Sequence, residues 1–189
     1  DDIIITSDLD EIPRADAIAM IKEDENDWDR YILTIPMFQY KINYMKIYDI
    51  NKQPNIMVTR ARCYSHPQQE REYTFPWNQK PDNLVFIDHA GWHFTYFGDN
   101  DNAITKIQNF AHTELNQDHI LSGYDIDRFI EQRCGHHGPQ HPERYEVVAV
   151  DEYFPQCIVN NTSRWQQNIV PQAHHSIYDF YPPNFRGDL

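Results

Sequence analysis

Cationic residues, cysteines and long apolar runs are scarce in this sequence. The 189 residues contain 16 Lys and Arg against 29 Asp and Glu, which gives a formal net charge of -13. A surface of this charge repels phosphate backbones, so we expect no nucleic-acid partner. The three cysteines, Cys63, Cys134 and Cys157, form no CxxC pair and allow at most one disulfide. No apolar run approaches the roughly 20 residues of a membrane-spanning helix, so the sequence predicts no membrane segment.

Large side chains, by contrast, are plentiful. Hydrophobic residues make up 40% of the chain and aromatic residues 14%, which excludes a disordered chain. A length of 189 residues suits one domain with a sizeable core. We expect residues 1–167 to form this domain and the Pro-rich, aromatic residues 168–189 to form a tail along its surface.

The first residues of the chain predict a buried strand followed by an acidic turn. Residues 3–5 are three consecutive isoleucines, a pattern typical of a strand covered on both faces in the middle of an α/β sheet. Pro13 then suits the first turn of a helix that continues to about Glu25. Because the sequence begins inside a strand, we expect a further segment upstream, without which the edge beside residues 3–5 is exposed and residues 1–189 are poorly soluble or do not bind the ligand of the intact protein.

Further along the chain, residue patterns predict a mixture of strands and helices. Aromatic and β-branched residues predict two or three strands within 30–48, and Pro, Gln and Glu predict a long surface loop over 65–82. Helical spacing of apolar residues predicts two amphipathic helices. The remaining predicted strands are 56–63, 84–87 and 145–150, and the predicted helices are 103–111 and 120–133.

Three carboxylates within four residues, Asp8, Asp10 and Glu11, give the strongest functional signal. They repel one another unless a cation or several donors neutralise them, and such clusters suit Mg²⁺ or Mn²⁺ holding a diphosphate. The turn also lies where an α/β sheet binds ligands, beyond the carboxyl end of a strand. The alternative is an acidic cap on the following helix, but a cap needs one carboxylate rather than three.

Three other segments contain residues able to do chemistry. The aromatic stretch 91–98 places Trp92 beside His93, which together form either a sugar-binding platform or an ordinary core strand. His112 and Glu114 follow a predicted helix and suit a metal ligand and a general base, although a histidine at a helix end also interacts with the helix dipole. The run Cys134-Gly-His-His-Gly-Pro-Gln-His141 contains zinc-ligand types, but its spacing matches no standard zinc finger.

Three ordered blocks resemble glycosyltransferase family 17, the family of β-1,4-mannosyl-glycoprotein β-1,4-N-acetylglucosaminyltransferases. The blocks are DDIIITSDLDEIPR at 1–14, HAGWHFTYFG at 89–98 and ITKIQNFAHTE at 104–114. The resemblance implies an α/β fold of the GT-A type, with a mixed central sheet flanked by helices and its N-terminal nucleotide-binding portion missing from this chain. It also implies inverting transfer of a sugar, such as N-acetylglucosamine, from a nucleotide-diphosphate donor such as UDP-N-acetylglucosamine to a glycan acceptor, with Mn²⁺ or Mg²⁺ as cofactor.

The resemblance also implies roles for individual residues. Asp8 and Asp10 match the family's DxD metal motif, and His112, proposed above from its residue type, is a further candidate metal ligand. The substrate-binding candidates are Glu11, Arg14, Trp92 and His93. One carboxylate must accept the proton of the attacking acceptor hydroxyl, and Glu114 is the first candidate for this base, followed by Asp88 and Asp101. The compartment stays open, because a bacterial or viral member suits the cytoplasm and a eukaryotic member suits the Golgi lumen.

Two other functional classes compete with this interpretation. A strand followed by Asp-x-Asp also resembles the haloacid-dehalogenase phosphatases, in which Asp8 would be the nucleophile and Asp10 its acid/base partner. The third acidic motif that such an enzyme needs matches the stretch Gly98-Asp99-Asn100-Asp101 poorly. The aromatic content also suits a non-catalytic carbohydrate-binding module, but such a module gives no reason for three clustered carboxylates.

Overall fold

The structure is a computed structural model that describes residues 2–26, 28–47, 55–71, 73, 81–109 and 116–181. The chain is a mixed α/β protein with two sheets, divided into two compact units. Unit 1 holds the described residues up to Pro36 and from Asn55 to His93, and unit 2 holds Met37 to Ile47 and Phe94 to Tyr181. Within these described parts, no helix has both the length and the apolar character needed to span a bilayer.

A four-stranded sheet with the order β1-β6-β3-β7 forms the centre of unit 1. Strand β6 runs antiparallel to both of its neighbours, whereas β3 and β7 are parallel, so the sheet is mixed. Continuous runs of β-branched and aromatic residues account for these strands. Their bounds are β1 (Ile3–Thr6), β3 (Arg30–Thr34), β6 (Asn55–Arg60) and β7 (Leu84–Ile87).

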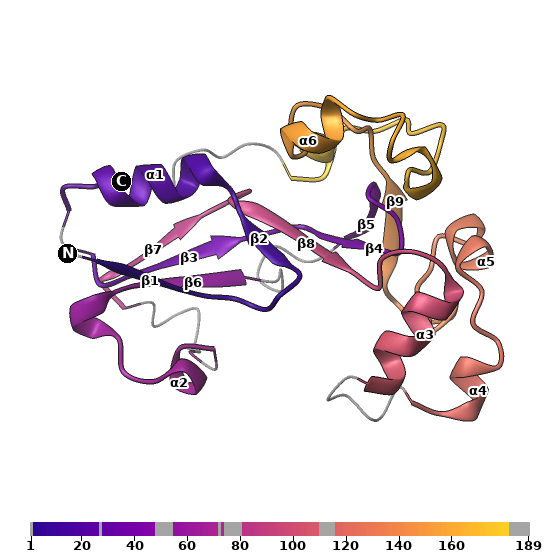
Figure 1. The fold of residues 1–189 in the computed structure, drawn as a ribbon, viewed down its shortest axis with the longest axis horizontal. Helices are drawn as coiled ribbons and strands as arrows, with labels where there is room; N and C mark the ends of the chain where they lie inside the picture. Colours follow the sequence, from indigo (N-terminus) through magenta and orange to yellow (C-terminus); the bar gives the residue numbers. More distant parts are fainter. Residues whose placement is uncertain are drawn as a thin grey trace. The chain divides into compact units, whose positions relative to one another are not determined.

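Helices lie on both faces of this sheet (Figure 1). On one face α1 (Ala15–Glu23) packs Ala17 and Ile21 against Leu33, Val58 and other core residues. A short 3-10 helix, η2 (Ala61–Cys63), leads from β6 toward α2 (Pro67–Arg71), which lies on the other face. Side chains alternate along β3, so Tyr31 and Leu33 pack in one apolar cluster and Ile32 packs in another, on the opposite face.

The second sheet has the order β2-β8-β4-β5-β9. In unit 1, β2 (Glu11–Pro13) pairs antiparallel with β8 (Gly91–Thr95), which continues into unit 2. Gly91 permits this pairing, because a Cβ atom there would lie 2.4 Å from the backbone oxygen of Ile12. In unit 2, β4 (Met37–Gln39), β5 (Tyr44–Ile47) and β9 (Arg144–Val147) are antiparallel neighbours.

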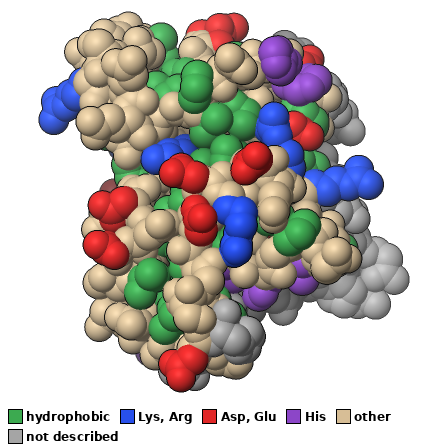
Figure 2. Space-filling model, turned by 90° about the vertical axis from the view of Figure 1, so that its right-hand side faces the viewer, with side chains coloured by type: hydrophobic (Ala, Val, Ile, Leu, Met, Phe, Trp, Pro, Cys, Tyr) green, Lys and Arg blue, Asp and Glu red, His purple; other side chains and the backbone are tan. Residues whose placement is uncertain are grey.

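Unit 2 has a largely aromatic core. Tyr44 lies parallel to Tyr145 with ring centroids 5.1 Å apart, and both side chains are fully buried. On the face drawn in Figure 2, acidic and basic side chains are interspersed rather than gathered into separate patches. The helices of this unit are α3 (Asn100–Asn109), α4 (Asp118–Leu121), α5 (Ile126–Glu131), α6 (Gln156–Val159), and the 3-10 helices η5 (Gln166–Asn168) and η6 (Ile177–Asp179).

Several sequence predictions need correction. The strand expected at 56–63 ends at Arg60 and is followed by the 3-10 helix η2, and the loop expected over 65–82 contains the helix α2. The strand at residues 3–5 exists, but it lies at an edge of the described sheet, and Ile5 is 40% exposed, because β6 is its only sheet neighbour among the described residues. Pro13 lies in β2 and not in the first turn of α1. The single helix expected at 120–133 is two short helices, α4 and α5, with a break at Ser122 and Gly123.

Candidate functional site

The acidic turn after β1 is closed by hydrogen bonds between its first and last residues. The backbone N–H of Glu11 donates to the carbonyl of Asp8 at 3.1 Å. In return, the backbone N–H of Asp8 donates to Oε2 of Glu11 at 2.8 Å. Glu11 therefore holds the turn, and Asp8 and Asp10 supply the other two carboxylates. Burial raises the pKa of Glu11, although the Asp8 hydrogen bond and the nearby His93 act in the opposite direction.

The pairing of β2 with β8 brings a histidine to this turn. Glu11 and His93 are register partners in the antiparallel pair. Nε2 of His93 lies 3.4 Å from Oδ2 of Asp10, and its Nδ1 lies 4.0 Å from Oε1 of Glu11. Side-chain exposure is only 13% for His93 and 25% for Asp10. The site therefore combines carboxylates and an imidazole from segments about 80 residues apart in the sequence.

Arg14, the N-cap residue of α1 directly after β2, lies against Trp92 of β8. The Arg14 guanidinium carbon is 5.3 Å from the centroid of the Trp92 ring, and its Nε pairs with Asp16 at 3.1 Å. Trp92 is only 8% exposed. The indole thus serves the packing of β8, and Arg14 is the more accessible member of this pair. The sugar-binding role of Trp92 stays a prediction.

Asp88 lies close to this strand pair at the end of β7. The Thr34 hydroxyl donates to Oδ1 of Asp88 at 2.7 Å, which fixes the carboxylate. The backbone N–H of Ala90 donates to the carbonyl of Thr34, and the N–H of Arg14 donates to the carbonyl of Ala90. The segment that follows Asp88 is therefore hydrogen-bonded both to Thr34 and to Arg14, which begins α1. His89, between Asp88 and Ala90 in the sequence, has a positive φ of 57°, a conformation that non-glycine residues seldom adopt.

Three further residues were predicted to belong to the site: Asp101, His112 and Glu114. Asp101 lies in the first turn of α3, in unit 2, and is exposed. His112 and Glu114 fall outside the described residues. The roles predicted for these three residues stay predictions.

The residues of the acidic turn fit a divalent cation only as part of a larger coordination shell. Among the side chains that the structure describes, no group of three His, Cys, Asp or Glu residues is placed to hold a metal ion. Mg²⁺, however, keeps several waters and binds through one or two carboxylates together with substrate phosphates. Asp8 and Asp10 supply the two carboxylates of such a site, and the remaining ligands would have to come from water or from a bound phosphate.

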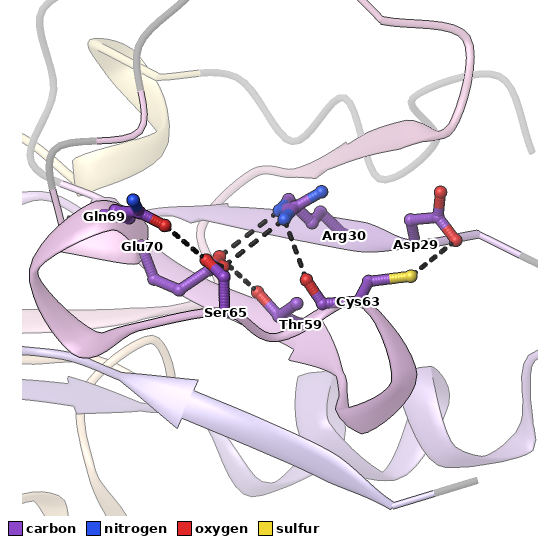
Figure 3. Close-up of polar contacts among 7 residues, drawn as sticks. All are labelled: Asp29, Arg30, Thr59, Cys63, Ser65, Gln69 and Glu70. Atoms are coloured by element: carbon purple, nitrogen blue, oxygen red, sulfur yellow. Dashed lines mark hydrogen bonds and ion pairs between the residues drawn. The ribbon is translucent and has the colours of Figure 1, made fainter.

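A second polar cluster in unit 1 has a structural task (Figure 3). Glu70 on α2 is buried, accepts a hydrogen bond from Thr59 at 2.9 Å and pairs with Arg30 at 3.2 Å. Burial disfavours the charged form of Glu70, but these donors outweigh it and hold its pKa below the ordinary value. Cys63 donates its thiol proton to Asp29 beside this pair. The cluster fixes α2 to the sheet.

The histidines of the run from Cys134 to His141 contact one another rather than converging on a common point. The ring centroids of His136 and His137 are 4.2 Å apart, and those of His137 and His141 are 4.6 Å apart. Cys134 is buried in the core of unit 2. Burial, with help from the neighbouring His137, lowers the pKa of His136 to about 4. His136 is the half-buried ring of the three, whereas His137 and His141 are exposed.

The sequence indicated the acidic turn, and the block at 89–98 includes His89, but nothing in the sequence indicated Thr34. Thr34 lies within an aromatic strand, and its link to Asp88 depends on the parallel pairing of β3 with β7. The contact between His93 and Asp10 likewise requires the register of β2 with β8. No family model, curated protein or solved structure matches the chain, so its function is inferred from this geometry and from the sequence pattern.

Proposed function

We propose that the chain is a metal-dependent inverting glycosyltransferase of the GT-A type. It moves a sugar, N-acetylglucosamine, from a UDP donor to a glycan acceptor. The main support is the register pair Glu11 and His93, because it joins two of the sequence blocks that resemble glycosyltransferase family 17. An ordinary helix cap gives no reason for a histidine from a distant strand to lie against Asp10.

The two aspartates suit the donor side of this reaction. Asp8 and Asp10 would hold Mn²⁺ or Mg²⁺, and that cation supplies the positive charge that the leaving nucleoside diphosphate requires. Arg14 lies three residues after Glu11, at the start of α1, and its guanidinium lies against Trp92 of β8. A guanidinium suits the oxygen atoms of a phosphate or of a sugar.

A carboxylate must also accept the proton of the acceptor hydroxyl as that oxygen attacks the anomeric carbon. Glu114 remains the first candidate on the resemblance. Asp88 is the candidate that the described structure supports best, because it lies in unit 1 with Asp10 and Thr34 orients its carboxylate. Asp101 is the weakest candidate, because it is exposed on α3.

A comparison of two substrates tests this proposal. The intact natural protein containing these residues is incubated with Mn²⁺ and either UDP-N-acetylglucosamine or p-nitrophenyl phosphate. We expect release of UDP from the nucleotide sugar, enhanced by a glycan acceptor, and no release of nitrophenol. Release of nitrophenol with UDP-N-acetylglucosamine left intact would instead establish the phosphatase alternative. If both substrates stay intact and the protein binds free saccharides, the carbohydrate-binding module is correct.

A further inference from the structure

Three histidines of unit 2 form a row that begins half-buried and ends exposed. The half-buried ring is His136, which lies 4.2 Å from His137, and that ring lies 4.6 Å from His141, measured between ring centroids. All three belong to residues 135–143, which lie between α5 and β9 and are called the His segment below. Charges of like sign at this spacing repel one another, so a proton on one ring disfavours a proton on the next.

The His segment lies against the aromatic core of unit 2. Gly135 contacts the phenol of Tyr145, since a Cβ atom at Gly135 would lie 2.5 Å from the Tyr145 hydroxyl oxygen. The His136 ring lies 5.7 Å from that of Tyr96, between centroids, and its Nδ1 lies 3.4 Å from the hydroxyl oxygen of Tyr40. His136 therefore faces rings that carry no charge to balance a proton.

The direction of the hydrogen bonds around His136 favours its neutral form. The Tyr145 hydroxyl donates to Oε1 of Gln39 at 2.8 Å, so the Gln39 NH₂ group faces Nδ1 of His136 at 3.3 Å. Nδ1 therefore accepts a hydrogen bond, and the single ring proton lies on Nε2. Nε2 is buried and has no hydrogen-bond partner among the described residues. Protonation of His136 would place a second N–H against the donors of Gln39, with no carboxylate in contact with the ring.

The charged groups near the row balance a proton at its exposed end and not at its buried end. Nδ1 of His141 lies 3.7 Å from Oε2 of Glu143. The same carboxylate pairs with the ammonium group of Lys46 on β5, which adds a positive charge close to the row. Burial, His137 and Lys46 all disfavour the charged form of His136, and the attraction of Glu143 only partly offsets them.

From this geometry we infer that the His segment is a pH-sensitive flap, which opens from Tyr145 and Gln39 when His136 takes up a proton. In the open state water hydrates the imidazolium and both of its N–H groups. The closed state holds the pKa of His136 at about 4, below the ordinary value of 6.5, so opening becomes easier as the pH falls between these values. The inference concerns unit 2 alone and does not depend on the proposed sugar transfer.

Backbone hydrogen exchange in the intact natural protein, followed by NMR, tests this inference. The N–H groups of Gly138 and His141 donate to carbonyls within the His segment at 2.9 and 3.2 Å, so their protection reports its opening. After correction for the intrinsic exchange rate, we expect this protection to fall roughly twentyfold between pH 7 and pH 5. At pH 5, about 1 M urea should lower it less than twofold, but should lower the protection of β5 amides roughly tenfold or more, because a local opening exposes little surface.

Two matched variants assign the effect to the row of histidines. His136→Asn should remove the pH dependence of the two reporter amides, whereas His174→Asn, which removes an exposed imidazole outside the row, should keep it. If His136→Asn does not fold, nitrogen NMR shifts of the natural protein give the same answer, and we expect a neutral His136 ring at pH 5 while the segment is closed. Unprotected reporter amides at pH 7, equal pH dependence in both variants, equal urea sensitivity of the segment and β5, or a charged His136 in a closed segment at pH 5 would overturn the inference.

Discussion

Of the three carboxylates of the acidic turn, Glu11 forms a hydrogen bond that closes the turn, and the turn positions the other two, Asp8 and Asp10. Glu11 accepts the Asp8 N–H and lies beside His93, so its removal would open the turn. Asp8 and Asp10 are placed by that turn. The sequence could indicate the cluster, because a run of carboxylates after an apolar strand can be recognised from the order of residues alone. The contact between Asp10 and His93 could not be predicted, because it depends on the register of two distant segments.

The catalytic base can be identified by comparing three isosteric variants. If Glu114 accepts the proton of the acceptor hydroxyl, Glu114→Gln lowers kcat by roughly a hundredfold or more and leaves donor binding intact. Asp88→Asn has that effect if Asp88 is the base, whereas Asp101→Asn on the exposed first turn of α3 should keep nearly full turnover. Turnover with saturating UDP-N-acetylglucosamine measures the difference. Full activity of both Glu114→Gln and Asp88→Asn would remove both residues from the reaction.

At the scale of elements, the attachment of α2 to the sheet depends on one ion pair. Glu70→Ala leaves Arg30 without its carboxylate, and breaking a largely buried pair costs about 3 kcal/mol. The double variant Arg30→Met with Glu70→Leu replaces both charges by apolar groups and should recover most of that stability. Urea denaturation measures the free energies of unfolding. If the double variant is as unstable as Glu70→Ala, the loss of stability does not come from leaving the Arg30 charge without a partner.

The same carboxylate predicts a pH effect. Because the pKa of folded Glu70 lies below its ordinary value, its contribution to stability is present above about pH 4.5 and is lost as the pH falls through the folded pKa. Glu70→Gln should therefore flatten the acid side of the stability curve, measured by thermal unfolding between pH 3 and 5 on the usual carboxyl scale. An unchanged slope would mean that the carboxylate is not held by Arg30 and Thr59.

Strong local sequence patterns predicted individual helices and strands well, but they did not predict which strands pair with one another. The helix after the acidic turn and strand β7 follow from apolar spacing and from the run Leu84 to Ile87. The three-residue strand β2 was missed because it contains Pro13 and is too short to show alternation. The central position expected for residues 3–5 was wrong, because three isoleucines look the same at a half-exposed edge and in a buried strand.

For the whole molecule, His136 predicts how the free energy of unfolding depends on pH. Its folded pKa of about 4 lies below the unfolded value near 6.5, so at pH 5 only the unfolded imidazole binds a proton. Stability should therefore fall by about 3 kcal/mol as the pH drops from roughly 6.5 to 4. The variant His136→Asn should flatten this slope in urea titrations, and His174→Asn, which removes an exposed imidazole, should keep it. Equal slopes in both variants would contradict the lowered pKa of His136.

The most direct test measures UDP binding by isothermal titration calorimetry in the intact natural protein, with Mn²⁺ and with EDTA. Asp8 and Asp10 are predicted to bind the diphosphate through the cation, so Mn²⁺ should tighten binding by roughly tenfold or more. Asp10→Asn should remove most of that gain. Glu131→Gln, which makes the same change in an exposed carboxylate on α5, should retain it. If UDP affinity is the same with Mn²⁺, with EDTA and in Asp10→Asn, the acidic turn does not hold a metal-bound donor.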